Sequence, residues 1–279
     1  MRYTLSTLTL LLPALLFAQE PAPADAAPRA AAPPAFAFTL GAGVFAGPKY
    51  LGSDETRVLP IPIAGVSYRN RVFLGPSPNG VGAGLAVNLV QTRALTLSVG
   101  LGGSEPRPED RADALAGMDD RRLGIATLSG LTYRYGPVSA GVAVSAGLRD
   151  NAGVTGTGNL GLTLPVLSRT FFSLGGSVTL ANQDAMRYDF GITPGEATRR
   201  AALITAGDGR LRAGDGLPYT PSGGVRDVGA TASLAHMLSP RWSLFGFGAV
   251  TRLSDRAAKS SLVRRQTGWS TGAGFTVGL

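Results

Sequence analysis

The chain has 279 residues, of which 39 are glycine, none is cysteine and 16% are charged, with a formal net charge of +8. Soluble domains carry about 25% charged residues, so much of this surface is expected not to face water. The lack of cysteine excludes a disulfide framework and thiolate metal sites. The arginines are scattered rather than grouped with aromatic residues, which argues against nucleic acid and favours lipid phosphates and lipopolysaccharide as acidic neighbours.

The first 18 residues have the pattern of a signal peptide. Arg2 precedes an apolar stretch at residues 8–17, and Ala18 stands before the expected cleavage point. Residues 19–35 are almost entirely alanine and proline, a composition that cannot bury a core and predicts a disordered periplasmic segment. The folded part is therefore expected to span residues 36–279.

From residue 36 onwards the chain alternates between apolar and small or polar residues, the period-two pattern of a strand with one apolar face. The pattern is clearest at residues 267–279, where Trp269, Phe275 and Val277 share one face. About twelve such segments follow in chain order: 36–46, 57–68, 71–75, 81–90, 93–102, 123–135, 138–148, 157–166, 170–182, 225–238, 241–252 and 267–279. Because proline cannot donate to a ladder, Pro60 and Pro62 predict an irregularity in the second segment.

These segments are expected to cross a membrane as a closed sheet. No interior run reaches the roughly 20 apolar residues of a spanning helix, whereas many segments approach the roughly 9–11 residues of a tilted spanning strand. Every backbone N–H and C=O must be paired inside a membrane, which leaves a closed barrel. A soluble glycine-rich β-sandwich is the alternative on composition alone.

The connections decide between these two architectures. Tight turns such as Arg69-Asn70, Gly136-Pro137 and Ser239-Pro240 alternate with long links, apart from a short link at 77–80. This is the rhythm of periplasmic turns and external loops in an outer-membrane barrel, and a sandwich has no reason to show it. The sequence therefore predicts an all-β fold, a transmembrane antiparallel up-and-down β-barrel with both termini in the periplasm.

The longest link, residues 183–224, is predicted to be structured. Residues 193–196 (Thr-Pro-Gly-Glu) form a capping box with proline at the first helical position, which predicts a short helix. Tyr188, Phe190 and Ile192 carry more apolar surface than a solvated loop needs, so we expect them to pack inside the barrel wall or close its mouth. Inward positions are mostly small, so a wet lumen and a lumen filled by this loop both remain open.

Residues that offer chemistry are interpreted structurally. His236, the only histidine, shares the apolar face of its strand, so it is expected to face lipid rather than serve a Ser–His hydrolase site. Two carboxylate pairs, Glu109-Asp110 and Asp119-Asp120, are expected to be solvated loop charges rather than Ca²⁺ ligands. Gly207-Asp208-Gly209 and Gly214-Asp215-Gly216 faintly resemble Ca²⁺ loops but are expected to belong to a flexible, solvated glycine-rich loop. Tyr133, Tyr135 and Trp242 lie beside tight turns and fit a periplasmic aromatic girdle.

Four ordered stretches carry a combination of loose motifs. Their positions are Pro48, Tyr50, Gly52, Ser53, Asp54 and Pro60, then Tyr188, Phe190 and Gly191, then Gly224, Arg226 and Asp227, and finally Asp255 and Ser260. In this order they resemble the MltA-interacting protein (MipA)/OmpV family of outer-membrane proteins. Ser261 stands where that family usually has proline, and Leu279 where a terminal aromatic residue is commoner.

The resemblance implies a non-enzymatic protein of the bacterial outer membrane, without catalytic residues or a cofactor. The namesake member is regarded as a scaffold that joins a murein-degrading lytic transglycosylase to a murein synthase, and other members look like porin-like or adhesion proteins. We therefore expect a scaffold or interaction protein of the cell envelope. A porin-like channel for small solutes is the alternative, and it rests on the small inward residues.

Overall fold

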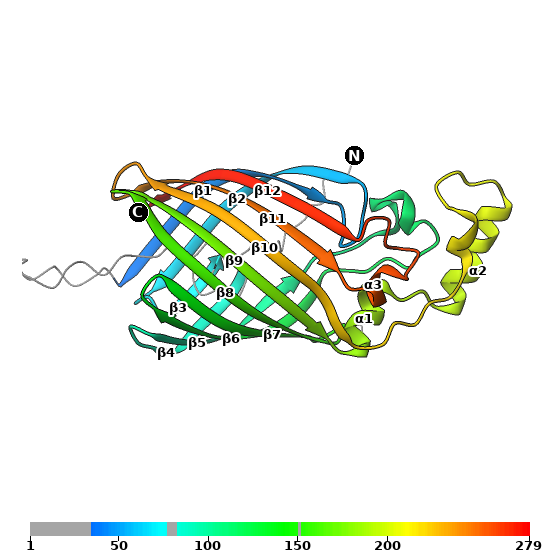
Figure 1. Cartoon of the computed structure of the whole chain (residues 1–279), viewed down its shortest axis with the longest axis horizontal. Helices are drawn as coiled ribbons and strands as arrows, with labels where there is room; N and C mark the ends of the chain where they lie inside the picture. Colours follow the sequence, from blue (N-terminus) through cyan, green and yellow to red (C-terminus); the bar gives the residue numbers. More distant parts are fainter. Residues whose placement is uncertain (1–34, 77–82, 150–151) are drawn as a thin grey trace, which may run out of the picture.

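The computed structural model describes residues 35–76, 83–149 and 152–279. In these ranges twelve antiparallel strands close into one barrel, in which each strand pairs with its neighbours in sequence and β1 pairs with β12 (Figure 1). The strands are β1 (Phe36–Pro48), β2 (Thr56–Tyr68), β3 (Val72–Pro76), β4 (Ala83–Gln91), β5 (Leu95–Ser104), β6 (Gly124–Tyr135), β7 (Val138–Gly147), β8 (Val154–Leu167), β9 (Thr170–Ala181), β10 (Gly224–Met237), β11 (Trp242–Leu253) and β12 (Thr267–Gly278). The predicted up-and-down barrel is confirmed.

Three helices lie in the long links: α1 (Gln183–Phe190), α2 (Pro194–Thr205) and α3 (Asp255–Ala258). Short 3-10 helices are η1 (Glu109–Arg111), η2 (Asp113–Leu115) and η3 (Ala213–Gly216). None of the helices in the described ranges is long and apolar enough to cross a membrane. The expected signal peptide, the alanine- and proline-rich segment up to residue 34, and the link at 77–80 lie outside the described residues.

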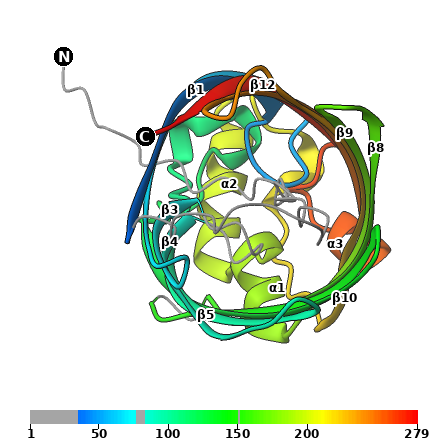
Figure 2. The same ribbon diagram turned by 90° about the vertical axis from the view of Figure 1, so that its left-hand side faces the viewer.

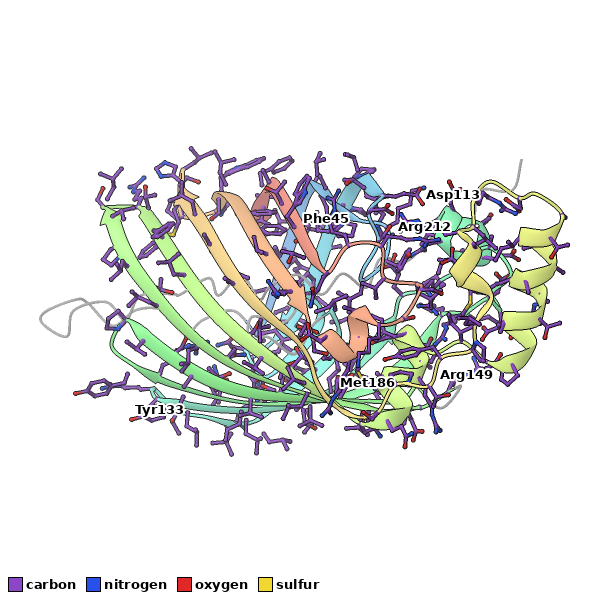
Figure 3. All side chains as sticks on the ribbon, turned by 45° about the vertical axis from the view of Figure 1, so that its right-hand side comes forward. Phe45, Asp113, Tyr133, Arg149, Met186 and Arg212 are labelled. Atoms are coloured by element: carbon purple, nitrogen blue, oxygen red, sulfur yellow. The ribbon has the colours of Figure 1, made fainter. Side chains whose placement is uncertain are left out.

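Period-two alternation places the large apolar side chains on the outside of the barrel. Phe38, Val44, Leu160 and Val250 all point outward and are exposed, as side chains of a lipid-facing band are. Tyr133 projects from the wall near the end where the tight turns lie (Figure 3). Tyr135 and Trp242 are also exposed at this end, which agrees with the predicted girdle.

Two of the tight turns use left-handed backbone conformations. Gly136 has φ 56°, and Arg69 and Asn70 have φ values of 48° and 53° in the three-residue link between the ladder partners Tyr68 and Val72. Asparagine tolerates such a conformation well. The geometry of this link fixes the register of β2 against β3.

Pro60 and Pro62 leave the pairing of β2 with β1 undisturbed, so the expected irregularity is absent from that register. The carbonyl oxygen of Ala64 faces Gly75 of β3. Alternate residues of a strand direct their N–H and C=O groups to the same side, so both prolines turn their missing N–H towards β3. The described β2–β3 ladder covers only residues 66–68 of β2. The prolines lie beyond its end, where no ladder bond is lost.

Register shifts occur elsewhere, between β4 and β5, β8 and β9, and β9 and β10. They fall at Asn88/Val90, Pro165/Leu167 and Val225/Asp227. Such bulges are frequent at barrel rims, where they re-aim side chains. The shift at the start of β10 lies beside the loop-covered end described below.

The inner wall holds an apolar cluster that the sequence analysis did not foresee. Phe45, Phe245 and Phe247 are buried and pack with Ile61 and Ile63. The rings of Phe245 and Phe247 lie against Gly274 and Gly272 of the neighbouring strand β12, and the Phe45 ring lies against Gly47 of its own strand. A Cβ added to any of these glycines would meet the ring. Some glycines on the inner face therefore leave the space that an aromatic ring occupies.

Replacing Gly274 by alanine is expected to destabilise the barrel. A Cβ there would collide with the carbonyl oxygen of Ala42 and lie 2.8 Å from the Phe245 ring, and overpacking of this kind costs about 1–3 kcal/mol. The matched control is Gly248→Ala in β11, where an added Cβ meets nothing within 4 Å. Urea unfolding in lipid vesicles, followed by tryptophan fluorescence, measures the difference; equal midpoints for the two variants would contradict the assignment.

Candidate interaction surface at the capped end of the barrel

The long links fold together over one end of the barrel into a structure called here the cap. It comprises residues 49–55, 105–123, 182–223 and 254–266, which connect β1–β2, β5–β6, β9–β10 and β11–β12. Seen through the barrel from the opposite end, α1 and α2 lie across the far opening (Figure 2). The cap therefore stands in the path between the lumen and one side of the membrane.

Two buried clusters hold the cap together. The outer one joins all four links: Tyr50, Ala112, Ala114, Leu115, Met118, Ile192, Ala197 and Leu262, with Tyr219 against it. The inner one ties α1 and α3 to the ends of β9 and β11: Ala181, Ala185, Met186, Phe190, Leu253 and Ala257. Met186 lies at the base of the cap, and Asp113 and Arg212 lie farther out (Figure 3). The cap is thus a folded unit with its own core.

The predicted helix and its capping box are confirmed. Thr193 Oγ1 accepts a hydrogen bond from the Glu196 amide at 3.3 Å, and Glu196 Oε2 accepts one from the Thr193 amide at 2.8 Å. Phe190 and Ile192 are buried as predicted, whereas Tyr188 is half-buried beneath the Arg121 guanidinium, 4.2 Å from its ring centre. Ile192 packs among cap residues, whereas Phe190 packs against Ala181 and Leu253 at the ends of β9 and β11.

A buried arginine connects α2 to two other parts of the cap. Arg200 is fully buried, and its Nε donates to the Asp215 carbonyl at 2.7 Å. Its Nη1 donates to the carbonyls of Ala114 and Ala116, both at 2.9 Å. A side chain enclosed this way is satisfied only while the three segments stay together, so Arg200 acts as a clamp for the cap.

The two Gly-Asp-Gly stretches, both expected to be flexible and solvated, behave differently. Asp208 pairs with Arg210 two residues away, on the surface. Asp215 is buried and binds Arg264 through both carboxylate oxygens, with Arg200 Nη2 3.8 Å away. The expectation is therefore wrong for Asp215, because its partner lies 49 residues away on the β11–β12 link and leaves no mark in the local sequence.

The other paired carboxylates are structural too. Glu109 Oε1 accepts the Gly117 amide at 2.7 Å, and Asp120 Oδ1 accepts the Glu109 amide at 2.7 Å. Asp119 pairs with Arg199 at an exposed site. These carboxylates fix the fold of the β5–β6 link and the position of α2, rather than gathering around one point as cation ligands do.

The family-motif positions, far apart in sequence, meet mostly in the cap. The Tyr50 hydroxyl donates to the Leu262 carbonyl at 2.6 Å, and Ser260 Oγ donates to the Phe190 carbonyl at 2.7 Å. Arg226 bridges Asp189 and Asp227 at the start of β10. These bonds join all four motif stretches directly, which local sequence reasoning did not predict.

The remaining motif positions shape the backbone or the wall. Gly52 has φ +97° and accepts the amides of Arg264 and Arg265, while Gly191 leaves room for the Arg187 carbonyl. Five others lie in the cap or at the strand ends beside it: Pro48 at the end of β1, Ser53 in a hydrogen bond with the Glu55 amide, exposed Asp54, Gly224 with φ +140°, and Asp255 accepting from Gln266. Only Pro60 lies away from the cap, on the outer face of β2.

Two arginines lie side by side in the β5–β6 link. Arg107 and Arg121 form an isolated antiparallel bridge, and Arg107 Nη1 donates to the Asp189 carbonyl at 2.7 Å. Burial and the neighbouring Arg121 lower the pKa of Arg107 to about 10. Its Nε and Nη2 are buried without a hydrogen-bond partner in the part of the chain that the structure describes. This pair adds a repulsive contact to the cap, in which Arg200 Nη2 and Ser261 Oγ are also buried without a hydrogen-bond partner among the described residues.

His236 lies on the outer face of β10, as predicted. Its Nδ1 is 2.8 Å from Thr170 Oγ1, its partner across the β9–β10 ladder near the tight turns. A lipid-facing histidine bonded to a threonine lacks the orienting carboxylate of a Ser–His hydrolase site. The arrangement is that of a polar pair at the membrane interface.

Acid is expected to loosen the start of α2 through Glu196. Burial raises the pKa of this carboxyl, but the hydrogen bonds from Thr193 and Asp119 outweigh it and hold the pKa below its ordinary value of 4.5. A lowered folded-state pKa stabilises the cap above pH 4.5, and this contribution is lost as pH falls through the folded value. Amide exchange over residues 194–200, corrected for the intrinsic pH effect, should rise on acidification.

Glu196→Gln supplies the control for this effect. Glutamine keeps the shape of the capping box but does not titrate, so the variant should lose most of the acid dependence. An equally strong acid dependence in the variant would show that another group controls this end of the helix.

Comparison with solved structures finds outer-membrane proteins at low sequence identity. An outer-membrane channel from Pseudomonas putida F1 is 10% identical, with 93% of this chain and 99% of that chain covered and a TM-score of 0.41. The channel DcaP of Acinetobacter baumannii is 9% identical, with 88% and 96% covered and a TM-score of 0.36. At these values the likeness carries no argument about function. None of the curated proteins compared with the chain matches it.

The family model supplies the assignment. The model described as MltA-interacting protein MipA matches residues 40–277, from the first strand to the last. The match covers the barrel and the whole cap, including every motif position named above. The protein is thus a β-barrel of the bacterial outer membrane that belongs to the MltA-interacting protein MipA family.

Proposed function

We propose that this barrel is a non-enzymatic scaffold of the cell envelope rather than an open pore. The observation that carries the proposal is the buried core of the cap across the mouth, in which Met186, Phe190, Arg200 and Leu262 are almost completely shielded from solvent. A solute pore needs an open mouth, whereas a scaffold works without a passage through the barrel. The motif residues, on this proposal, build the cap that blocks this passage.

The family description points to the partner class. Its name refers to an interaction with MltA, a lytic transglycosylase, and we propose such an enzyme as one partner and a murein synthase as the second. Murein lies in the periplasm, on the side of the tight turns if the long loops are external. Residues 1–18 would direct export, and residues 19–35 would extend the scaffold's reach from that side.

Binding of purified partners tests this proposal. The detergent-solubilised barrel is immobilised, and a lytic transglycosylase and a murein synthase are added singly and together. Retention of both on one barrel is the expected result, with a variant lacking residues 19–35 reporting whether the N-terminal segment contributes. Retention of neither enzyme at micromolar concentration would overturn the scaffold function.

A solute channel is the second candidate, favoured by one feature of the lumen. The inner faces of β8 and β9 carry small polar side chains, among them Thr157, Ser177 and Thr179, and Asn159 is exposed on this face. A polar wall of this kind holds water when the mouth is open. Conductance of the intact and the uncapped barrel separates the two functions, as set out in the Discussion.

A further inference from the structure

Acidic and basic side chains are distributed very unequally between the two ends of the barrel. All the ion pairs found among the described residues lie in the cap or at the strand ends beside it. Every Asp and Glu of the described ranges also lies there. At the opposite end, where the tight turns lie, the described chain has no carboxylate except that of its C-terminus.

Arginines, in contrast, occur around the whole turn end. Five are exposed, and they are called here the arginine rim: Arg69 and Arg71 on the β2–β3 turn, Arg93 on β4–β5, Arg169 on β8–β9 and Arg241 on β10–β11. None of the five has an ion-pair partner within the described ranges. Exposed guanidinium groups without a carboxylate partner in the protein attract anions from their surroundings.

The arginine rim is at the level of the outward-facing aromatic residues. The Arg69 guanidinium lies 5.2 Å from the ring centre of Tyr68, whose side chain is on the outer face of β2. Arg241 directly precedes Trp242, and Trp242 stacks on Phe275 on the outer face. Aromatic girdles mark the depth of the lipid headgroups. The guanidinium groups are therefore within reach of headgroup phosphates.

We propose that the arginine rim binds the phosphates of anionic phospholipids, such as phosphatidylglycerol, in the periplasmic leaflet. Guanidinium groups bind phosphate oxygens through paired hydrogen bonds that a single ammonium group does not offer. The distribution favours lipid over an acidic protein, because four turns around the circumference carry an exposed arginine. A ring of lipids touches all of them, whereas a docked protein touches one arc. The inference does not depend on the proposed scaffold function.

The two tryptophans of the chain make the proposal directly measurable. Trp242 lies at the arginine rim, and Trp269 lies near the cap, on the outer face at the start of β12. Lipids brominated on the acyl chain quench the tryptophans that they touch. In the Trp269→Phe variant the remaining fluorescence comes from Trp242 and reports on lipids at the turn end. In the Trp242→Phe variant it comes from Trp269 and reports on lipids near the cap.

In phosphatidylethanolamine vesicles, brominated phosphatidylglycerol should quench Trp242 at lower mole fraction than brominated phosphatidylethanolamine. Trp269 should show no such preference. One arginine near an anionic surface contributes about a fivefold gain in binding. The combined variant Arg69→Gln, Arg93→Gln, Arg169→Gln and Arg241→Gln should therefore reduce the preference at Trp242 by a factor of ten or more.

Substitution of two exposed cap arginines, Arg122→Gln and Arg265→Gln, is the matched control and should leave the preference at Trp242 unchanged. Circular dichroism and heat-dependent gel mobility confirm that each variant is a folded barrel. Competition by free inorganic phosphate separates binding of a headgroup in the membrane from binding of the soluble ion. Equal quenching by the two lipids, or a preference that survives the four substitutions, would overturn the proposal. If the four substitutions abolished binding of poly-L-glutamate but left the lipid preference unchanged, the arginine rim would be assigned to an acidic protein instead.

Discussion

Removing the helical part of the cap is expected to convert a silent barrel into a conducting one. Ala181 and Gly224 are direct partners in the β9–β10 ladder, so a short glycine-serine link can replace residues 183–222 without moving either strand. The deletion removes α1, α2 and η3, and with them the segments that lie across the mouth (Figure 2). The remaining wall is a sheet with paired strands, and the polar inner side chains of β8 and β9 favour a water-filled lumen along that part of the wall.

Planar-bilayer recording measures this result. The intact protein should show no steady current, and the shortened protein should show stable open-channel steps. Deletion of residues 208–210, on the link between α2 and η3, is the control, since it shortens the same loop without removing a helix. A steady current through the intact protein would favour the channel function, and no current after the large deletion would show that the lumen is closed elsewhere.

Asp215→Asn is expected to open the cap while leaving the barrel closed. The buried carboxylate neutralises Arg264, which binds it through both oxygens, and lies near Arg200. Breaking a buried ion pair from one side costs about 3–5 kcal/mol, because the remaining cation stays buried without compensation. Here two arginines are left facing one neutral side chain, so α2 and η3 should detach from the β11–β12 link.

Hydrogen exchange and limited proteolysis detect this local opening better than global unfolding, since the strand ladders do not depend on Asp215. Amides of α2 should exchange faster in the variant, and a protease should cleave between residues 194 and 216. Asp208→Asn is the matched control, because Asp208 lies in the other Gly-Asp-Gly stretch and its ion pair with Arg210 is on the surface. Similar exchange in both variants would show that Asp215 is not a clamp of the cap.

The sequence by itself determined the elements of this protein whose causes are local. Alternation of side chains fixes which face of a strand is apolar, so the twelve strands and their outward residues follow from a period of two. The start of α2 follows from Thr193 and Glu196, which are three residues apart and satisfy each other's amides. Turn chemistry and loop length gave the order of turns and long links, and hence the up-and-down topology.

Only the tertiary structure decided features that depend on residues far apart in the chain. Asp208 and Asp215 have nearly identical neighbours in sequence, yet one is on the surface and the other binds Arg264 inside the cap. Pro60 and Pro62 are tolerated because they turn their missing N–H groups towards the short strand β3, beyond the end of the described ladder. The sequence predicts that the segment 71–75 is short, but not the side to which the prolines turn. The physical reason is the same throughout: burial and ion pairing depend on which distant segments share a space, and closure of the barrel brings those segments together.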